Sequence, residues 1–159
     1  MSQSLPVSDV NQVDPREMQA LQHYLQEYGQ QADVLVQQLQ ALEEGRMEAL
    51  AAIDALKELL ATPEDTVLLP LGGGASVRAR VIEPESVLLN IGADIALERS
   101  NTDAVEFLKD RVTEMEASAK KVAETIDRIR SQMNEIARRI EIGYQQAQMS
   151  AQPGQVKGG

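Results

Sequence analysis

The chain has 159 residues, of which 43% are hydrophobic and only 3% are aromatic. It carries 15 Lys and Arg against 25 Asp and Glu, a formal net charge of −10, and it contains no Cys and no Trp. Few aromatic residues beside many aliphatic ones favour a helical assembly over a β-sandwich or an α/β enzyme. The acidic balance argues against nucleic-acid binding, because neutralising phosphates requires clustered Lys and Arg. The absence of Cys from the sequence excludes disulfides, thiolate metal sites and Cys nucleophiles.

The sequence shows no membrane or export signal. No apolar run approaches the roughly 20 residues that span a bilayer, and the first residues lack the basic and apolar regions of a signal peptide. We therefore expect a cytoplasmic protein that does not bind membranes. The acidity has two interpretations, adaptation to a salt-rich cytosol or an ordinary solvated helical surface.

A long helix is predicted over residues 14–61. Asp14 can cap it, Pro15 suits the first helical position, and Thr62-Pro63 ends it. Its apolar residues repeat with alternating spacings of three and four, which indicates a sustained coiled-coil seam. The a positions are Met18, Leu25, Ala32, Leu39, Arg46, Ile53 and Leu60, and the d positions are Leu21, Tyr28, Leu35, Leu42, Ala49 and Leu56.

A second helix is predicted over residues 100–148, after the capping cluster Ser100 to Asp103. It carries a second seam with the same spacing. We expect residues 1–13 to be flexible and residues 149–159 to be a disordered tail. The a positions of this seam are Val105, Val112, Ala119, Ile126, Met133 and Ile140, and the d positions are Leu108, Met115, Val122, Ile129, Ile136 and Gly143.

Two seams of similar length joined by a compact insert predict an antiparallel coiled-coil hairpin within one chain. Two registers, one heptad apart, place a positions opposite d positions. We prefer the register in which Leu39 faces Ile129 and Arg46 faces Val122. Arg46 then reaches an exposed carboxylate, such as Glu43 or Glu124, and is better interpreted as a register or flexibility device than as a functional site.

Residues 66–99 lose the helical period and alternate apolar with polar residues, as strands do. Gly72-Gly73-Gly74 and Gly92-Ala93-Asp94 are typical of turns, so the insert is predicted to be two β-hairpins. The triple glycine lacks the Gly-Lys-Ser/Thr ending of a phosphate-binding loop, and a hairpin turn is the better interpretation.

Isolated hairpins are marginally stable in water. With no helix crossing back over them, we expect that these two cannot bury their apolar faces within one chain. They should pair their edges with other chains in a closed barrel. The predicted oligomerisation residues are Val67, Leu69, Leu71, Val77, Val81, Val87, Leu89, Ile91, Ile95 and Leu97.

The order helix, two hairpins, helix resembles the α-type subunits of prefoldin, a chaperone family of archaea and eukaryotes. The resemblance covers about residues 15–148. It rests also on Leu69-Pro70-Leu71-Gly72-Gly73-Gly74, on Val87-Leu88-Leu89-Asn90-Ile91-Gly92-Ala93 and on the Phe107-Leu108 start of the second helix. Because it has two hairpins rather than one, the chain resembles the α type of the archaeal subunits.

The resemblance implies a single prefoldin-like domain over residues 14–148. It implies a hexamer of two α and four β subunits, in which the hairpins form a double β-barrel platform and the coiled coils project from it. Non-native polypeptides would be captured at the coiled-coil tips without ATP and passed to a group II chaperonin.

If the platform holds the insert, the free tips are about residues 15–36 and 132–149. Adaptable apolar side chains there would suit varied clients. Gly29 and Gly143 would loosen the helices and so aid exposure. The predicted client-binding residues are Met18, Leu21, Tyr24, Leu25, Tyr28, Ile136, Ile140, Ile142 and Tyr144, of which Tyr24, Ile142 and Tyr144 lie off the seam.

The sequence offers no catalytic, cofactor-binding or metal-binding residues, and we expect no enzyme. His23 is the only histidine, at an outward position without a ligand cluster. The alternative to a chaperone is a structural coiled-coil scaffold or tether that assembles through its hairpins.

Overall fold

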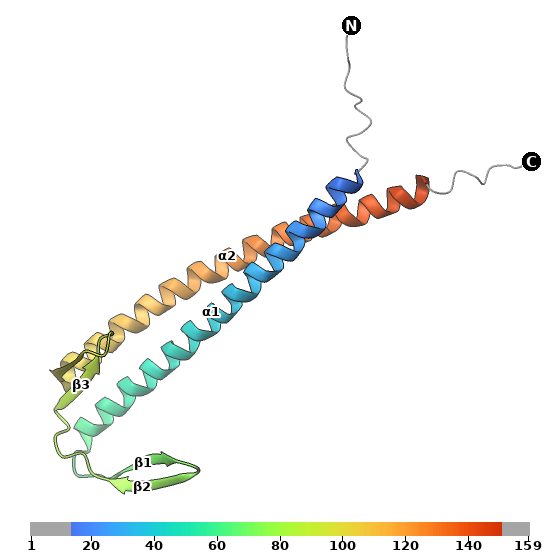
Figure 1. Ribbon diagram of the computed structural model, residues 1–159. Coiled ribbons are helices and arrows are strands. Elements are labelled where there is room, and N and C mark those ends of the chain that lie inside the picture. The colour runs from blue at the N-terminus through green and yellow to red at the C-terminus, as the bar shows by residue number, and fades with distance from the viewer. Residues whose placement is uncertain (1–13, 151–159) are drawn as a thin grey trace, which may run out of the picture. The chain divides into compact units, whose positions relative to one another are not determined.

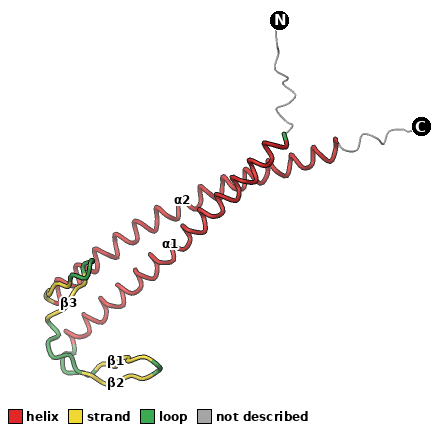
Figure 2. Tube along the Cα trace, viewed as in Figure 1, coloured by secondary structure: helices red, strands yellow, loops and turns green. Residues whose placement is uncertain are grey.

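The computed structural model describes residues 14–150. The elements follow in the order α1 (Pro15–Ala61), β1 (Val67–Gly72), β2 (Ala75–Ala79), β3 (Ser86–Asn90), β4 (Ala96–Ser100) and α2 (Asn101–Ser150), as Figures 1 and 2 show. Two long helices around a small β insert confirm the predicted mainly α fold. Of the expected flexible ends, residues 1–13 and 151–159 lie outside the described residues, whereas Met149 and Ser150 belong to α2.

The helix ends form as the capping residues predict. Asp14 Oδ1 accepts a bond from the backbone N–H of Arg16 at 3.4 Å, and the Asp14 carbonyl accepts the first helical bond of α1. At the start of α2, Ser100 Oγ accepts from the backbone N–H of Asp103 at 3.1 Å. Both caps satisfy backbone donors that a helix start leaves without partners.

Over residues 14–150, neither helix has a stretch apolar enough to cross a membrane.

The chain divides into two compact units. The central unit is Gln40–Lys120, and the terminal unit consists, among the described residues, of 14–39 and 121–150. In the central unit, buried side chains of both helices form one cluster, against which further seam residues pack. The buried members are Ala49, Ile53, Val105 and Val112, and the packed ones are Leu56, Leu108 and Met115.

The terminal unit has a core of the same kind, built from seam residues of the two helices. Its buried apolar side chains are Leu21, Ala32, Ile126, Ile129 and Ile140, and Gly143 is buried with them. In both units the predicted seam positions are buried or half-buried, with the exception of Leu60. The 3-4 spacing therefore identified the helical core correctly.

The preferred register of the two helices is wrong, and the alternative is the one observed. In the central unit Arg46 Nη1 lies 3.8 Å from Glu116 Oε1, and a Cβ on Gly45 would lie 3.0 Å from Met115 Sδ. In the terminal unit a Cβ on Gly29 would lie 3.6 Å from Met133 Cε. The seam pattern satisfies both registers equally, since they differ by one heptad. Leu60 is exposed because it belongs to the last turn of α1, where in this register α2 has only begun.

Asn101 joins three segments of the central unit and is 2% exposed. Its Nδ2 donates to the carbonyls of Leu56 and Pro84, both at 3.0 Å, and its backbone N–H donates to the carbonyl of Glu85 at 2.8 Å. The first residue of α2 is thereby tied to α1 and to the linker between the hairpins. These hydrogen bonds distinguish the observed register from the one a heptad away, which the apolar pattern does not.

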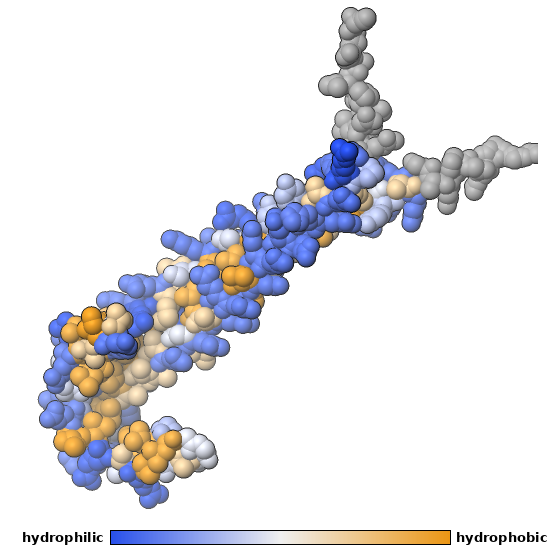
Figure 3. Space-filling view, in the orientation of Figure 1, coloured by the Kyte–Doolittle hydropathy of each residue, from blue (hydrophilic) through white to orange (hydrophobic). Residues whose placement is uncertain are grey.

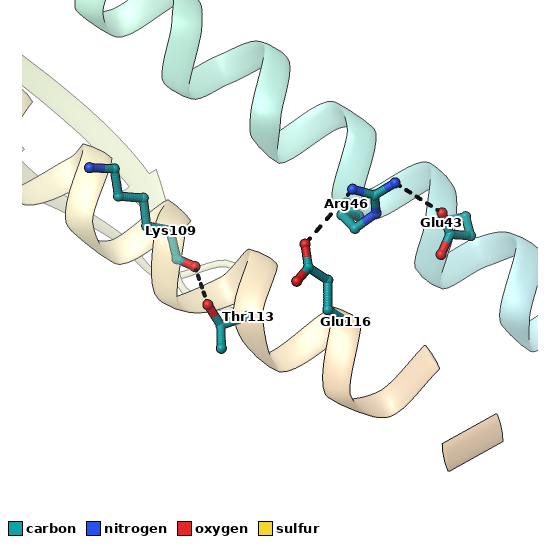
Figure 4. Close-up of polar contacts among 5 residues, drawn as sticks. All are labelled: Glu43, Arg46, Lys109, Thr113 and Glu116. Carbon is teal, nitrogen blue, oxygen red and sulfur yellow. Dashed lines mark hydrogen bonds and ion pairs between the residues drawn. The ribbon is translucent and has the colours of Figure 1, made fainter. Parts of the chain in front are cut away.

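Arg46 occupies a seam position and directs its guanidinium to the edge of the helix pair (Figure 4). Its Nη2 lies 3.3 Å from Glu43 Oε2, as expected. The second carboxylate is Glu116 rather than Glu124, because of the register. With its charge paired and its side chain half-buried, Arg46 is compatible with the seam.

The insert forms two antiparallel hairpins. In the first, Leu69 pairs with Val77 across β1 and β2, and the turn residues Gly73 and Gly74 have φ of 60° and 84°. Positive φ at both central residues is what a type I′ two-residue hairpin turn requires, and glycine adopts it without strain. In the second, Leu89 pairs with Leu97 across β3 and β4. Each sheet has two strands, so all four strands have one edge unpaired within the described chain.

Replacing Asn101 with Asp should destabilise the protein. A carboxylate would face the carbonyls of Leu56 and Pro84 in place of an amide donor, in a buried position. We expect a loss of about 3 kcal/mol, the order of a buried, unsatisfied charged group. Thermal unfolding followed by helical circular dichroism measures it, with Thr102→Ala at the neighbouring exposed position as the control. Equal melting temperatures for the two variants would contradict the role assigned to Asn101.

Replacing Gly29 with Ala should stabilise the terminal unit. The new Cβ would make an ordinary contact with Met133, and alanine favours a helix over glycine by about 1 kcal/mol. Gly45→Ala provides the comparison, because its Cβ would crowd Met115 Sδ at 3.0 Å. Denaturant unfolding should therefore show a larger gain for Gly29→Ala than for Gly45→Ala. The reverse order would mean that the contacts at these glycines differ from those described.

Candidate functional site

The predicted client-binding residues fall into an exposed and a buried group. Tyr24, Ile142 and Tyr144 are 51%, 41% and 52% exposed, and we call these three the tip residues. The others belong to the seam and pack between the helices of the terminal unit. Of those, Leu21 and Ile140 are buried, and Met18, Leu25, Tyr28 and Ile136 are half-buried.

Two polar contacts join the helices beside the tip residues. Gln22 Nε2 donates to the Tyr144 hydroxyl at 2.8 Å, and Arg139 Nη2 lies 3.1 Å from Glu17 Oε1. The hydroxyl of Tyr144 is thereby held while much of its side chain stays accessible. Neither contact follows from the apolar pattern, which describes only the seam. Exposed pairs of this kind add little to stability, about 1 kcal/mol or less.

His23 is exposed, as the sequence predicts. Its Nε2 lies 3.1 Å from Glu27 Oε1, and its ring centroid is 6.3 Å from that of Tyr24. Over residues 14–150, no three His, Cys, Asp or Glu side chains converge in a way that could hold a metal ion.

A shallow groove of about 580 Å³ lies between the helices of the terminal unit. Its apolar residues are Val34, Leu35 and Ile129, and Val34 is exposed. Gln30 and Thr125 are among its polar residues. The predicted client-binding residues do not include those that line this groove. The groove is formed by residues of two helices, and the sequence left the register of these helices open.

The first hairpin leaves its apolar side chains exposed. Val67, Leu69, Leu71 and Val77 of the predicted oligomerisation set are exposed, and Val81 after β2 is half-buried. Leu68, on the other face, is 69% exposed. On the face that Figure 3 shows, apolar side chains gather over the hairpins. Such a surface is typical of a segment that packs against another chain.

The second hairpin departs from the prediction that neither hairpin buries a face within the chain. Leu89 is 8% exposed, and Val87 and Leu97 are half-buried. Figure 1 shows β3 beside the first turns of α2, where Leu89 and Leu97 line a groove with Phe107. The remaining members of the predicted set, Ile91 and Ile95, are exposed.

Comparison with known proteins agrees with this architecture. The sequence matches the family described as "Prefoldin subunit" over residues 28–146. It is 58% identical to prefoldin subunit alpha of Methanoregula boonei over 85% of this chain and 88% of that protein. It is 49% identical to prefoldin subunit alpha of Methanoculleus marisnigri over 92% of this chain and 97% of that one.

A solved structure has the same fold. It is filamentous PFD from Methanocaldococcus jannaschii, studied by cryo-EM, and it matches with a TM-score of 0.62 at 19% identity. The match covers 72% of this chain and 96% of the other. Together with the extent of the family match and the identity to the two α subunits, these findings show that the chain belongs to the prefoldin family.

Proposed function

We propose that this chain is an ATP-independent chaperone subunit of the cytoplasm. It captures non-native polypeptides at the ends of its coiled coil and delivers them to a group II chaperonin. It works as an α subunit, two copies with four β subunits, assembled through the β-hairpins into a barrel platform. The support for this proposal is membership of a chaperone family, which is not an enzyme family, together with two exposed apolar surfaces of the chain.

The observation that carries the proposal is the exposure of the tip residues. They lie off the seam, so the partner helix leaves them accessible. A tyrosine offers a large apolar ring with a polar end at a small cost in side-chain entropy, which suits contact with many different sequences. Aliphatic Ile142 adds apolar area on α2. Non-native chains expose apolar side chains, and burying these against the tip residues would be favourable.

The assembly proposal is supported by the hairpins. A two-stranded hairpin is marginally stable alone, and the first hairpin here leaves its apolar side chains exposed. Each strand also has one unpaired edge. Pairing these edges with strands of other subunits would satisfy the backbone groups and cover the apolar side chains.

Removing the tip residues should weaken chaperone activity. The triple variant Tyr24→Ser, Ile142→Ser and Tyr144→Ser removes exposed apolar area and leaves the seam intact. We expect suppression of citrate synthase aggregation, measured by light scattering on the assembled complex, to require about tenfold more protein, which corresponds to about 1.4 kcal/mol of client affinity.

The matched control is Met47→Ser with Leu50→Ser, which removes exposed off-seam apolar side chains from the central unit. The control should leave suppression unchanged, and both variants should keep the mass of the wild-type complex. Equal losses in the two variants would contradict capture at the tip residues. Undiminished suppression in the triple variant would favour the alternative, a structural scaffold.

Charged residues on the first hairpin should prevent assembly. In the variant Leu69→Lys with Val77→Lys, two ammonium groups replace a cross-strand apolar pair, and like charges directly opposite each other are unfavourable. Native mass measurement after co-expression with a β-type subunit should show free chains, whereas circular dichroism should show unchanged helix content. Met47→Lys serves as the control for an added surface charge. A complex of wild-type mass formed by the hairpin variant would contradict assembly through this hairpin.

A further inference from the structure

The groove of about 580 Å³ in the terminal unit, which we call the side groove, continues a face of α1 that begins at a tip residue. Tyr24, Glu27, Gln31 and Val34 follow one another at spacings of three and four, so they share this face. Tyr24 is 51% exposed and Val34 is 63% exposed. From α2, the buried Ile129 lines the groove. The helix pair thus leaves a continuous, partly apolar face uncovered.

The polar residues of the side groove are mostly neutral. Glu27 is the one charged residue among those that line it, and its Oε1 lies 3.1 Å from His23 Nε2. The others are Gln30, Gln31 and Thr125. The two glutamine amides can each donate and accept hydrogen bonds, as an extended backbone requires of a partner. A segment that is extended, apolar and almost uncharged would therefore complement the groove.

The residues before α1, which lie outside the described part of the chain, have this chemistry in their sequence. Among residues 1–13 only Asp9 carries a charged side chain, and the apolar run Leu5-Pro6-Val7 is followed by Val10. A residue that precedes proline favours an extended backbone, and valine does so as well. Val13 and Met18 occupy the positions of a hydrophobic staple, which sets the angle at which the chain enters a helix.

The length of this segment matches the position of the side groove. Leu5-Pro6-Val7 lies 8 to 10 residues before Pro15, which is about 26–33 Å of extended chain. Gln31–Leu35 lies 16 to 20 residues after Pro15, which is about 24–30 Å along α1. By the same arithmetic Val10 comes to the height of Tyr24. An extended segment that runs back along α1 therefore brings its apolar run to the groove.

The residues after α2 suit the side groove less well. Val156 comes six residues after Ser150 and reaches about 20 Å when extended. Ile129 lies 21 residues before Ser150, about 32 Å along α2. The segment before α1 is thus the better occupant.

We propose that residues 5–10 dock in extended form along this face of α1, with Leu5-Pro6-Val7 in the side groove and Val10 against Tyr24. A tethered segment has an effective concentration in the millimolar range, so a weak contact suffices to keep it docked. The docked segment covers a tip residue, and a client must displace it. This competition rests on the proposed function, whereas the docking itself does not.

Disulfide trapping tests the docking, since the chain has no Cys of its own. In the full chain at low concentration, Val7→Cys is combined with Val34→Cys or, as the matched control, with Asp33→Cys, an exposed neighbour on another face of α1. In oxidised glutathione, the pair with position 34 should close an intrachain disulfide about tenfold faster than the control pair. Mass measurement after thiol alkylation gives both rates.

Adding Leu5→Ser and Val10→Ser to both pairs should remove this difference, because the apolar contacts are lost. Equal rates at positions 33 and 34 would overturn the docking, and so would a difference that survives the serine substitutions. Disulfides that join two chains in place of one would overturn docking within the chain.

The locked chain tests the competition with clients. In the assembled complex, the disulfide between positions 7 and 34 should raise the amount of protein needed to suppress citrate synthase aggregation about threefold, and a reductant should reverse this. The wild-type complex, given the same oxidant and reductant, controls for effects on the partner subunits and the client. Equal suppression by the locked and reduced forms would overturn the competition. A reduced complex and a wild-type complex that both fail to suppress aggregation would instead contradict the proposed function.

Discussion

The amide of Asn101 links α1, α2 and the linker between the hairpins at a single buried point. One side chain donates to two backbone carbonyls that are far apart in sequence, and its backbone N–H donates to a third. Without this tie, two seams of regular spacing could slide by one heptad and still bury apolar residues. The bonds of Asn101 are formed in the same register of the central unit as the contact between Arg46 and Glu116 and the packing at Met115. A local polar interaction thus distinguishes two registers that the apolar seam alone leaves equivalent.

The linker that Asn101 contacts separates two hairpins with different surroundings. The second hairpin packs Leu89 near the first turns of α2, and the first hairpin finds no comparable cover. Since a lone hairpin gains little from folding in water, the exposed apolar side chains of the first hairpin support the proposal that it associates with other chains.

Much of the fold could be predicted from the sequence because it depends on local patterns. Capping residues located the start of α2 at Ser100, the 3-4 spacing identified the seam, and the glycines of the first turn have the positive φ that their position requires. The register could not be predicted, because a heptad pattern is the same after a shift of seven residues. The burial of Leu89 was missed since it depends on where the second hairpin lies against α2.

The exposure of three side chains in the candidate site could be predicted from the sequence. The spacing placed Tyr24, Ile142 and Tyr144 off the seam, and all three are exposed. The contact between Gln22 and Tyr144 was not foreseen, because long polar side chains meet across a helix pair only when its register is known.

The central claim is that clients contact this chain at the tip residues. Site-specific photo-crosslinking measures that contact directly, with a benzophenone amino acid placed at Tyr24, at Tyr144 or, as a control, at Met47 in the assembled complex. The account predicts that a chemically unfolded client is crosslinked from positions 24 and 144 and only at background level from position 47. Equal crosslinking from position 47, or none from the tip positions, would contradict it.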